Sequence, residues 1–305
     1  MIAVVGEALI DLVVAGDGAI TATPGGAPFN VARACARLGM PVRLVAAVST
    51  DRFGQRLITD LAADGVDDAY VQRREQPTTL ALAEVDPSGA ASYRFYLDGT
   101  SAPTLSATEL PTGTRALVAG GLGVAVEPMA SAVERMVVES GEEVLVLVDV
   151  NCRPAAIADR DRYLERLDRV LGRADLVKVS VEDLGYIDLA TPAATVATRL
   201  LTRCTRAVLL TAGPVATTVL TRAGERVVPV DDVPVVDSIG AGDTFTAAFL
   251  VWWMATGRGV DDLDDVDAVA SAVEAAHLAA ALIVGRRGAD PPHRDELPSD
   301  WATGR

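Results

Sequence analysis

The sequence predicts an α/β fold with three layers, α/β/α, in which helices cover both faces of a mainly parallel central sheet. The first observation is an alternation of short apolar runs and helical stretches after about residue 115, which is the pattern of βαβ units. The second is a pair of hairpin-like segments near the N-terminus, which predict a small separate β-sheet. The third is size: 305 residues, 50% of them hydrophobic, suffice for one large domain spanning 1–305.

The chain before residue 115 is expected to supply elements of the main fold and two excursions from it. The main elements are a strand at 2–6, a helix at 29–38 ended by Gly39, a strand at 42–48 and a helix that ends at 63. Two hairpins are predicted by β-forming runs on either side of turn residues, at 12–15 and 20–23, and at 79–85 and 91–97. These excursions, about 12–23 and 78–98, form either a lid over a site or a plain extension of a sheet.

The chain after residue 115 is expected to build the rest of the parallel sheet. Its predicted strands are 116–119, 144–148, 176–179 and 207–210, and its predicted helices are 128–140, 155–172 and 192–203. An edge hairpin at 215–230, a short extended run at 233–236, an apolar helix at 244–256 and a last helix at 266–284 follow.

Composition narrows the class of function. The net charge of −15, from 27 basic and 42 acidic residues, argues against binding to nucleic acid or to an anionic membrane surface, although a small anionic substrate stays open. Cys35, Cys152 and Cys204 form no metal or redox motif and favour a reducing compartment. The chain enters a strand at once and has no stretch of eighteen apolar residues, so we expect a cytoplasmic protein with no membrane span.

The most informative stretch runs from Asp237 to Asp243 and reads Asp-Ser-Ile-Gly-Ala-Gly-Asp. It precedes an apolar helix, and the first amides of a helix lack intrahelical partners and favour anions. Gly240 and Gly242 would let an anion approach the backbone closely. A carboxylate at Asp243 would repel a phosphate there, unless it serves as a general base. The alternative is an ordinary helix start, where Gly and Asp are common.

Other candidates are the polar residues that follow predicted strands, because ligands of open α/β sheets bind at the carboxyl ends of the strands. They are Asp11, Gly25, Gly26, Asn30, Gly120, Gly121, Asp149, Asn151, Arg153, Lys178, Ser180, Glu182, Asp183, Thr211 and Gly213. The sequence has no GxxxxGK[ST] and no complete GxGxxG. A Walker-type phosphate loop is therefore absent, and a dinucleotide-dependent oxidoreductase is disfavoured.

Taken together, these blocks resemble the ribokinase-like (PfkB) family of sugar kinases over nearly the whole chain. The block at 237–243 is similar to the family's D-T-x-G-A-G-D, with Ser238 in place of Thr, and the block at 24–32 is similar to its G-G-x-x-x-N-x-A. Supporting matches are Gly6-Glu7 with Asp11, and the runs at 51–54, 149–154, 178–183 and 287–289. The resemblance implies a ribokinase-like fold and an ATP-dependent transfer of phosphate to a sugar hydroxyl.

The resemblance also implies roles for particular residues. Asp243 would take the proton from the sugar hydroxyl, and the backbone amides of Gly240, Ala241 and Gly242 would stabilise charge on the transferring phosphoryl group. Asp11, Gly25, Gly26 and Asn30 match positions that hold the sugar, and Arg153 matches a position near the phosphates or an acidic group of the substrate. The nucleotide side would be formed by Lys178, Ser180, Thr211, Gly213 and His277.

Metal ions enter through the same resemblance. Mg²⁺ is expected with ATP, organised through water by Glu182 or Asp183, since both carboxylates fit the family's spacing. Asp237 and the carbonyl of Ile239 match positions that bind a monovalent cation, usually K⁺, in many relatives. Relatives often dimerise through the lid, so a homodimer is an expected partner state.

The substrate is the least constrained expectation. The openings at 6–11 and 25–28 look most like those of fructokinases and 2-keto-3-deoxygluconate kinases. Leu97 stands where such kinases commonly carry an arginine, which favours a neutral hexose or pentose such as fructose. Asp11, Phe29, Asn30 and the lid around Tyr96 and Leu97 would decide the sugar. The alternatives are a nucleoside or 2-keto-3-deoxygluconate kinase, or a catalytically silent sugar-binding regulator on the same fold.

Overall fold

The computed structural model describes residues 1–14, 18–85, 91–188, 190–201 and 205–302. Cys204 and the turns predicted near residues 16–17 and 86–89 lie outside the described residues.

The described residues form one large sheet with the strand order β13-β12-β11-β10-β9-β8-β1-β4-β5. Pairing is parallel from β5 to β11 and antiparallel for β12 and β13 at the other edge. The strands are β1 Ile2–Val5, β4 Val42–Ser49, β5 Val71–Arg74, β8 Ala116–Gly120, β9 Leu145–Asp149, β10 Leu176–Ser180, β11 Ala207–Thr211, β12 Ala216–Thr221 and β13 Glu225–Pro229. The predicted three-layer α/β fold with a mainly parallel sheet is confirmed.

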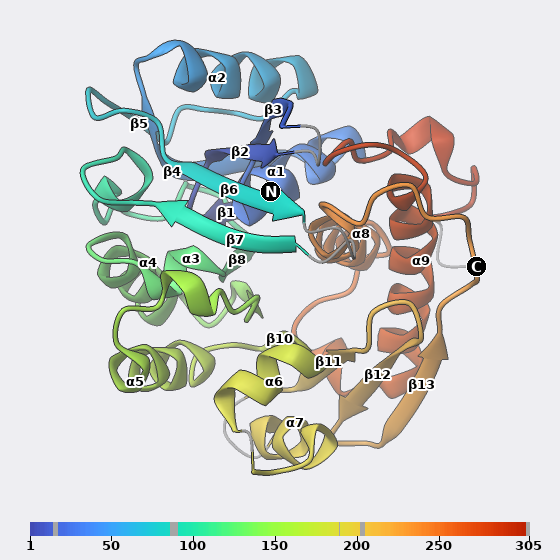
Figure 1. Ribbon diagram of the computed structural model, residues 1–305. Coiled ribbons are helices and arrows are strands. Elements are labelled where there is room, and N and C mark those ends of the chain that lie inside the picture. Colours follow the sequence, from blue (N-terminus) through green and yellow to red (C-terminus); the bar gives the residue numbers. More distant parts are fainter. Residues whose placement is uncertain (15–17, 86–90, 189, 202–204, 303–305) are drawn as a thin grey trace.

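Helices cover both faces of this sheet, as Figure 1 shows with α8 and α9 at one side and α3 to α5 at the other. The helices are α1 Ala27–Arg37, α2 Arg52–Asp64, α3 Leu122–Ala125, α4 Met129–Val138, α5 Arg160–Leu171, α6 Val181–Ile187, α7 Ala193–Leu201, α8 Ala241–Ala255 and α9 Val266–Val284. The described residues also form the 3-10 turns η1 Ala102–Thr104, η2 Pro154–Ala156, η3 Asp261–Asp264 and η4 Arg294–Glu296.

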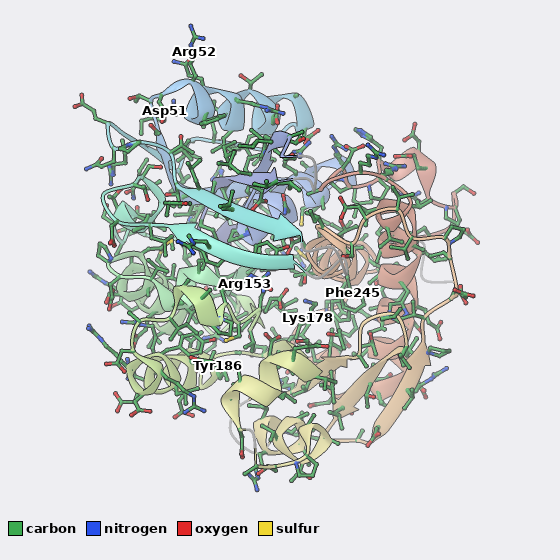
Figure 2. The ribbon with its side chains drawn as sticks, viewed as in Figure 1. Asp51, Arg52, Arg153, Lys178, Tyr186 and Phe245 are labelled. Atoms are coloured by element: carbon green, nitrogen blue, oxygen red, sulfur yellow. The ribbon has the colours of Figure 1, made fainter. Side chains whose placement is uncertain are left out.

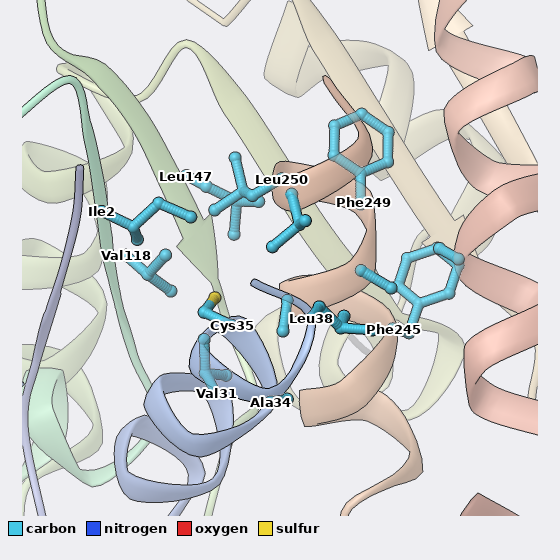
Figure 3. Packing of buried hydrophobic residues seen from close by; sticks show 14 of the residues in the cluster. Ile2, Val31, Ala34, Cys35, Leu38, Val118, Leu147, Phe245, Phe249 and Leu250 are labelled. Atoms are coloured by element: carbon cyan, nitrogen blue, oxygen red, sulfur yellow. The ribbon is translucent and has the colours of Figure 1, made fainter. Parts of the chain in front are cut away.

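Two cores lie on the two faces, because alternate residues of each buried strand point to opposite sides. Ile2 and Val4 pack with α1, α2, α8 and α9, whereas Ala3 and Val5 pack with α3 to α7. Figure 3 shows part of the first core, which contains Phe245, Phe249 and Leu250 of α8 together with Cys35 and Leu38. The helix α8 is buried from Thr244 to Trp253, whereas its first turn, at Ala241 to Asp243, is partly exposed.

A second sheet of four strands stands apart, in the order β3-β2-β6-β7. Its strands are β2 Leu9–Val14, β3 Ile20–Gly25, β6 Leu80–Val85 and β7 Ala91–Tyr96. The two hairpins join through parallel pairing of β2 with β6, which puts Asp11 beside Ala81. Asp51, the N-cap of α2, fixes the base of the second hairpin, since its carboxylate accepts both the N–H and the hydroxyl of Thr78 at 2.8 and 2.6 Å.

Several sequence-based boundaries were wrong for identifiable reasons. Residues 233–236 join no strand among the described residues, although the N–H of Val236 donates to the carbonyl of Val284. The apolar helix begins at Ala241 rather than at 244, so Gly240 is its N-cap. The edge strand β5 was missed because its residues are polar, and α6 because it is only 7 residues long.

Helix α9 is, among the described residues, the one helix long and apolar enough by length and composition to span a membrane. It packs instead against α8, β12 and β13, and Trp301 donates its indole N–H to the carbonyl of Ala275 at 2.9 Å. Its apolar composition is accounted for by its place in the core.

Candidate active site

A cavity of about 570 Å³ lies where the carboxyl ends of β1, β9 and β10 meet the N-termini of α1 and α8, with the small sheet as one wall. It brings together nine of the residues to which the resemblance assigns roles: Asp11, Gly26, Asn30, Arg153, Lys178, Ile239, Gly240, Gly242 and Asp243. Three other strand-end candidates, Gly121, Asp149 and Asn151, also line it. Figure 2 shows Arg153 and Lys178 in the central region of the molecule, near β7 in that view. The placement follows the rule that ligand sites of open α/β sheets lie at the carboxyl edge.

The first turn of α8 forms one side of the cavity. Gly240 adopts φ 78°, and a Cβ there would lie 2.9 Å from the Cβ of Ala289, so both the backbone and the packing require glycine. The N–H of Ala241 donates to the carbonyl of Ser238 at 3.2 Å. Within the part of the chain that the structure describes, the N–H groups of Gly242 and Asp243 have no backbone acceptor, which is the condition for holding an anion.

Asp243 is partly buried in this turn and is bound by one residue of α1. The side-chain amide of Asn30 donates to Oδ2 of Asp243 at 2.8 Å, although 213 residues separate the two in sequence. Burial raises the pKa of Asp243 to about 6, and the repulsion of Asp149 adds to the rise, whereas the Asn30 bond, Lys178 and Arg153 oppose it. The carboxylate is therefore ionised at neutral pH and can accept a proton.

A buried ion pair lies beside this turn. The Nζ of Lys178 donates to Oδ2 of Asp149 at 2.7 Å, and the two residues are 8% and 6% exposed. The hydroxyl of Thr246 lies 3.1 Å from the same Asp149 oxygen and 3.0 Å from the carbonyl of Gly242. A Cβ at Gly242 would lie 3.4 Å from the Lys178 ammonium. A positive charge is thus fixed next to the free amides of α8.

Asp11 projects into the cavity from β2. A Cβ at Gly25 would lie 1.9 Å from its Oδ2, so the absence of a side chain at Gly25 makes room for the carboxylate. Burial raises the pKa of Asp11 to about 6, helped by Asp243 and opposed by Arg153. Gly26, at φ 100°, would place a Cβ 2.8 Å from the carbonyl of Glu7, which explains the second glycine of the pair.

The residues by which the small sheet lines the cavity are not Tyr96 and Leu97, which were expected from the sequence. Tyr93 and Phe95 of β7 line the cavity, and their rings stack with centroids 6.4 Å apart. Tyr96 and Leu97 do not line it, and Phe29 is fully buried in the core, where the guanidinium of Arg33 lies over its ring. Side chains of a strand alternate between its two faces. The register of β7 with β6 was therefore needed to tell which aromatic residues face the cavity.

Arg153 and the acidic pair of α6 have different surroundings. Arg153 is exposed, and its nearest partner is the carbonyl of Cys152, so its guanidinium is available to a ligand. Asp183 accepts the N–H groups of Cys152 and Ser180 at 2.7 and 2.9 Å, which ties the loop after β9 to the start of α6. Glu182 is exposed. Neither Glu182 nor Asp183 lines the cavity.

Of the residues expected on the nucleotide side, Lys178 lines the cavity, whereas Ser180, Thr211, Gly213 and His277 do not. Ser180 caps α6, Thr211 ends β11 and Gly213 adopts φ 53° just after it. His277 of α9 bonds the hydroxyl of Thr217 at 2.9 Å and packs against Phe245, and burial lowers its pKa.

Asp237 joins the glycine-rich loop to the segment after α9. Its carboxylate accepts the N–H groups of Ile239 and Gly288 at 3.0 and 2.9 Å. Arg33, on α1, donates to the carbonyl of Ala289 with a distance of 3.3 Å. The run at 287–289 is thus bound both to α1 and to the loop before α8. The sequence motifs at 237–243 and 287–289 therefore form one structural unit.

Three cavity residues carry buried oxygens with no hydrogen-bond partner among the described residues. They are Glu7 Oε2, Asn30 Oδ1 and Asp149 Oδ1. Glu7 was quoted from the sequence only as part of the Gly6-Glu7 match and was given no role. Unsatisfied buried oxygens are rare, so those of Asn30 and Asp149 indicate where donor groups of a ligand would bind.

Comparison with known proteins places the chain in a known group. The model of the family described as pfkB family carbohydrate kinase matches residues 1–296. The fructokinase of Rhizobium leguminosarum bv. trifolii is 31% identical over 257 residues, which are 82% of this chain and 78% of that one. The fructokinase of Klebsiella pneumoniae is 30% identical over 304 residues, 96% and 97% of the two chains. The structure is similar to that of fructokinase with bound ATP from Xylella fastidiosa, with a TM-score of 0.86 and 28% identity over 97% and 94% of the chains.

Proposed function

Since the chain belongs to the pfkB family of carbohydrate kinases and is an ATP-dependent phosphotransferase with an alcohol group as acceptor, we propose that its substrate is fructose. The structural observation that supports phosphoryl transfer at this site is the hydrogen bond from Asn30 to Asp243, which holds a carboxylate with a raised pKa at the start of α8. The relatives favour fructose over a nucleoside or 2-keto-3-deoxygluconate, and the complete Gly-Ala-Gly-Asp turn disfavours a silent regulator.

In the proposed reaction the sugar lies between α1 and the small sheet. The carboxylate of Asp11 and Oδ1 of Asn30 accept hydrogen bonds from hydroxyl groups of the sugar, and Gly25 and Gly26 let the sugar ring approach the backbone. Asp243 takes the proton of the reacting sugar hydroxyl as the hydroxyl oxygen attacks the γ-phosphorus of ATP, and the bond from this phosphorus to the β,γ-bridging oxygen breaks to release ADP. The turn at Gly240, Ala241 and Gly242, together with Lys178, stabilises the charge of the transferring group, and Arg153 contacts the phosphates.

The nucleotide is proposed to extend from this turn toward β10, β11 and α9. Ser180, Thr211 and Gly213 would contact it, and His277 would lie against the adenine. Mg²⁺ neutralises charge on the phosphates when it is bound. Of Glu182 and Asp183, Glu182 is the exposed carboxylate, whereas Asp183 accepts two backbone N–H groups. Glu182 would contact Mg²⁺ through water, which suits an ion that keeps several waters. Asp237 and the carbonyl of Ile239 supply oxygen ligands that fit a monovalent cation such as K⁺.

The small sheet is proposed to act as a lid on a single domain, with Tyr93 and Phe95 against the sugar. No arginine stands at Leu97, and the lid side chains that line the cavity are apolar or aromatic, with Asp11 the one acid. These groups suit a neutral sugar better than an acidic or phosphorylated one. We further propose a cytoplasmic enzyme that pairs as a homodimer through the edges of this sheet.

The test is an ADP-release assay across fructose, other neutral hexoses, pentoses, nucleosides and 2-keto-3-deoxygluconate, with Mg²⁺ and K⁺ present. We expect the highest kcat/KM with fructose. Higher kcat/KM with a nucleoside or the keto-deoxy acid would refute the substrate assignment, and no turnover with any of them would favour the silent regulator.

Gly25→Ala is expected to impair sugar binding selectively. The added methyl group would lie 1.9 Å from Oδ2 of Asp11 and displace this carboxylate. A hydrogen bond to a charged group contributes about 1.5–3 kcal/mol, which corresponds to a rise of roughly 10–100-fold in the KM for fructose. The KM for ATP should not change. Gly185→Ala is the matched control, since its Cβ would meet nothing within 4 Å. An unchanged KM for fructose in Gly25→Ala would contradict the role of Asp11.

A further inference from the structure

One buried acid of the cavity has no part in the proposed reaction. Glu7 follows β1 at the carboxyl edge of the sheet and is 3% exposed. Its Oε1 accepts the N–H of Ala27 at 3.3 Å, and its Oε2 has no partner among the residues that the structure describes. Burying a carboxyl group is costly unless it makes specific hydrogen bonds, so this placement calls for a function.

The contact with Ala27 takes the place of an ordinary helix cap. Ala27 is the first residue of α1, and its N-cap is Gly26, which has no side chain to offer. A Cβ at Gly26 would lie 2.8 Å from the carbonyl of Glu7, so no capping side chain could be accommodated there. The N–H of Ala27 has no partner within the helix, and Glu7 accepts it from the connection between β1 and β2.

The same turn of α1 carries the residue that holds the catalytic base. Asn30 lies three positions after Ala27, and its amide donates to Asp243 at 2.8 Å. Its other side-chain atom, Oδ1, is buried without a partner among the described residues, so its orientation is set by the helix and by Asp243. A shift of the first turn of α1 would therefore move Asn30 relative to Asp243.

On this basis, which rests on the proposed kinase function, we propose that Glu7 is a positioning residue that fixes the start of α1 and, through Asn30, the carboxylate of Asp243. The proposal concerns the length and the hydrogen-bond acceptor of Glu7, not its charge. Burial raises the pKa of Glu7 to about 8, with two backbone hydrogen bonds and Arg153 opposing the rise. Glu7 is therefore protonated where Asp243 titrates, and its charge has little effect on the base.

Three substitutions separate these properties. Glu7→Gln keeps the length and the acceptor without the charge and mimics the protonated acid. Glu7→Asp keeps the acid but is too short to reach Ala27, and Glu7→Ala removes both. With fructose and ATP we expect kcat to fall about 10²-fold in Glu7→Ala and Glu7→Asp, as for a misplaced catalytic group, and to stay near wild type in Glu7→Gln. KM values should change little. Asp265→Ala removes an ordinary cap from α9 at a position that does not line the cavity, and it should lower only the melting temperature.

A second readout needs no substrate. Carboxyl-carbon NMR follows the titration of Asp243, whose charged and polar neighbours are Asn30, Asp149, Lys178, Arg153, Asp11 and Glu7 itself. Because the Asn30 bond favours the ionised form, loosening it should raise the pKa of Asp243 in Glu7→Ala and Glu7→Asp but not in Glu7→Gln.

The outcomes are distinct. A wild-type protein that phosphorylates no sugar refutes the proposed function, while the NMR titration still tests the role of Glu7. An active wild type with equal losses in Glu7→Gln and Glu7→Ala overturns the proposal, since charge would then matter. A rise in the KM for fructose alone overturns it in favour of direct sugar contact. A lower melting temperature with unchanged kcat and unchanged pKa of Asp243 reduces Glu7 to a structural cap and also overturns it.

Discussion

Asp243→Asn is expected to bind ATP as the wild-type protein does and to lose phosphoryl transfer by about 10²–10⁴-fold in kcat. The substituted side chain keeps the size of the original and can still accept the amide hydrogen of Asn30, which donates to Asp243 at 2.8 Å. It cannot take a proton from a sugar hydroxyl at neutral pH, because an amide is a very weak base. The geometry of the site should therefore survive while its chemistry is lost.

The measurement combines ADP release with fructose and calorimetry of ATP binding. The pH dependence of kcat in the wild-type protein should also report on Asp243, since activity needs its ionised carboxylate. The pKa of Asp243 is raised to about 6, so kcat should fall as the pH drops through that value, and this acid limb should not occur in the residual activity of Asp243→Asn. Asp265→Asn makes the same exchange at the start of α9 and should keep full activity. Turnover near wild type in Asp243→Asn would exclude a base at this position.

The fold could be predicted from the sequence because its strands are buried on both faces. The run 145–149 is apolar up to Asp149, and the run 176–180 is apolar apart from Lys178 up to Ser180, so the sequence pattern locates both strands directly. β5 at the edge lacks that signal, since none of its residues is fully buried. The helix α8 was placed three residues late, because glycines and an acid look like a loop until the backbone shows Gly240 as the cap.

The sequence predicted those site residues that follow a strand or belong to a motif, but not the contacts between them. The carboxyl-edge rule and the motif at 237–243 selected residues that do line one cavity. Glu7 belonged to a quoted match but received no role, because its partner is the backbone N–H of Ala27 and no sequence pattern marks such a contact. The aromatic wall was assigned to Tyr96 instead of Tyr93, since the register of the hairpin decides which side chains face the cavity.

Lys178→Met is expected to be the most destabilising single change in the site. The ammonium is the ion-pair partner of Asp149, and both residues are almost fully buried. Removing one partner leaves a buried charge without compensation, which costs about 3–5 kcal/mol of unfolding free energy. The surface pair of Arg226 with Asp267 supplies the control, since its residues are exposed and Arg226→Met should cost about 0–1 kcal/mol.

The double variant Asp149→Asn with Lys178→Met separates stability from chemistry. With the carboxylate replaced by a neutral amide, which can still accept from the hydroxyl of Thr246, most of the lost unfolding free energy should return. Turnover should not return, because the charge that lies beside Gly242 is still missing, and the loss of one such stabilising group reduces kcat by about 10²–10³-fold. Urea denaturation and ADP release on the single and double variants measure the two effects. If the double variant recovers stability and turnover together, Lys178 serves only to neutralise Asp149, and the phosphoryl charge must then be stabilised by Arg153 and the amides of α8.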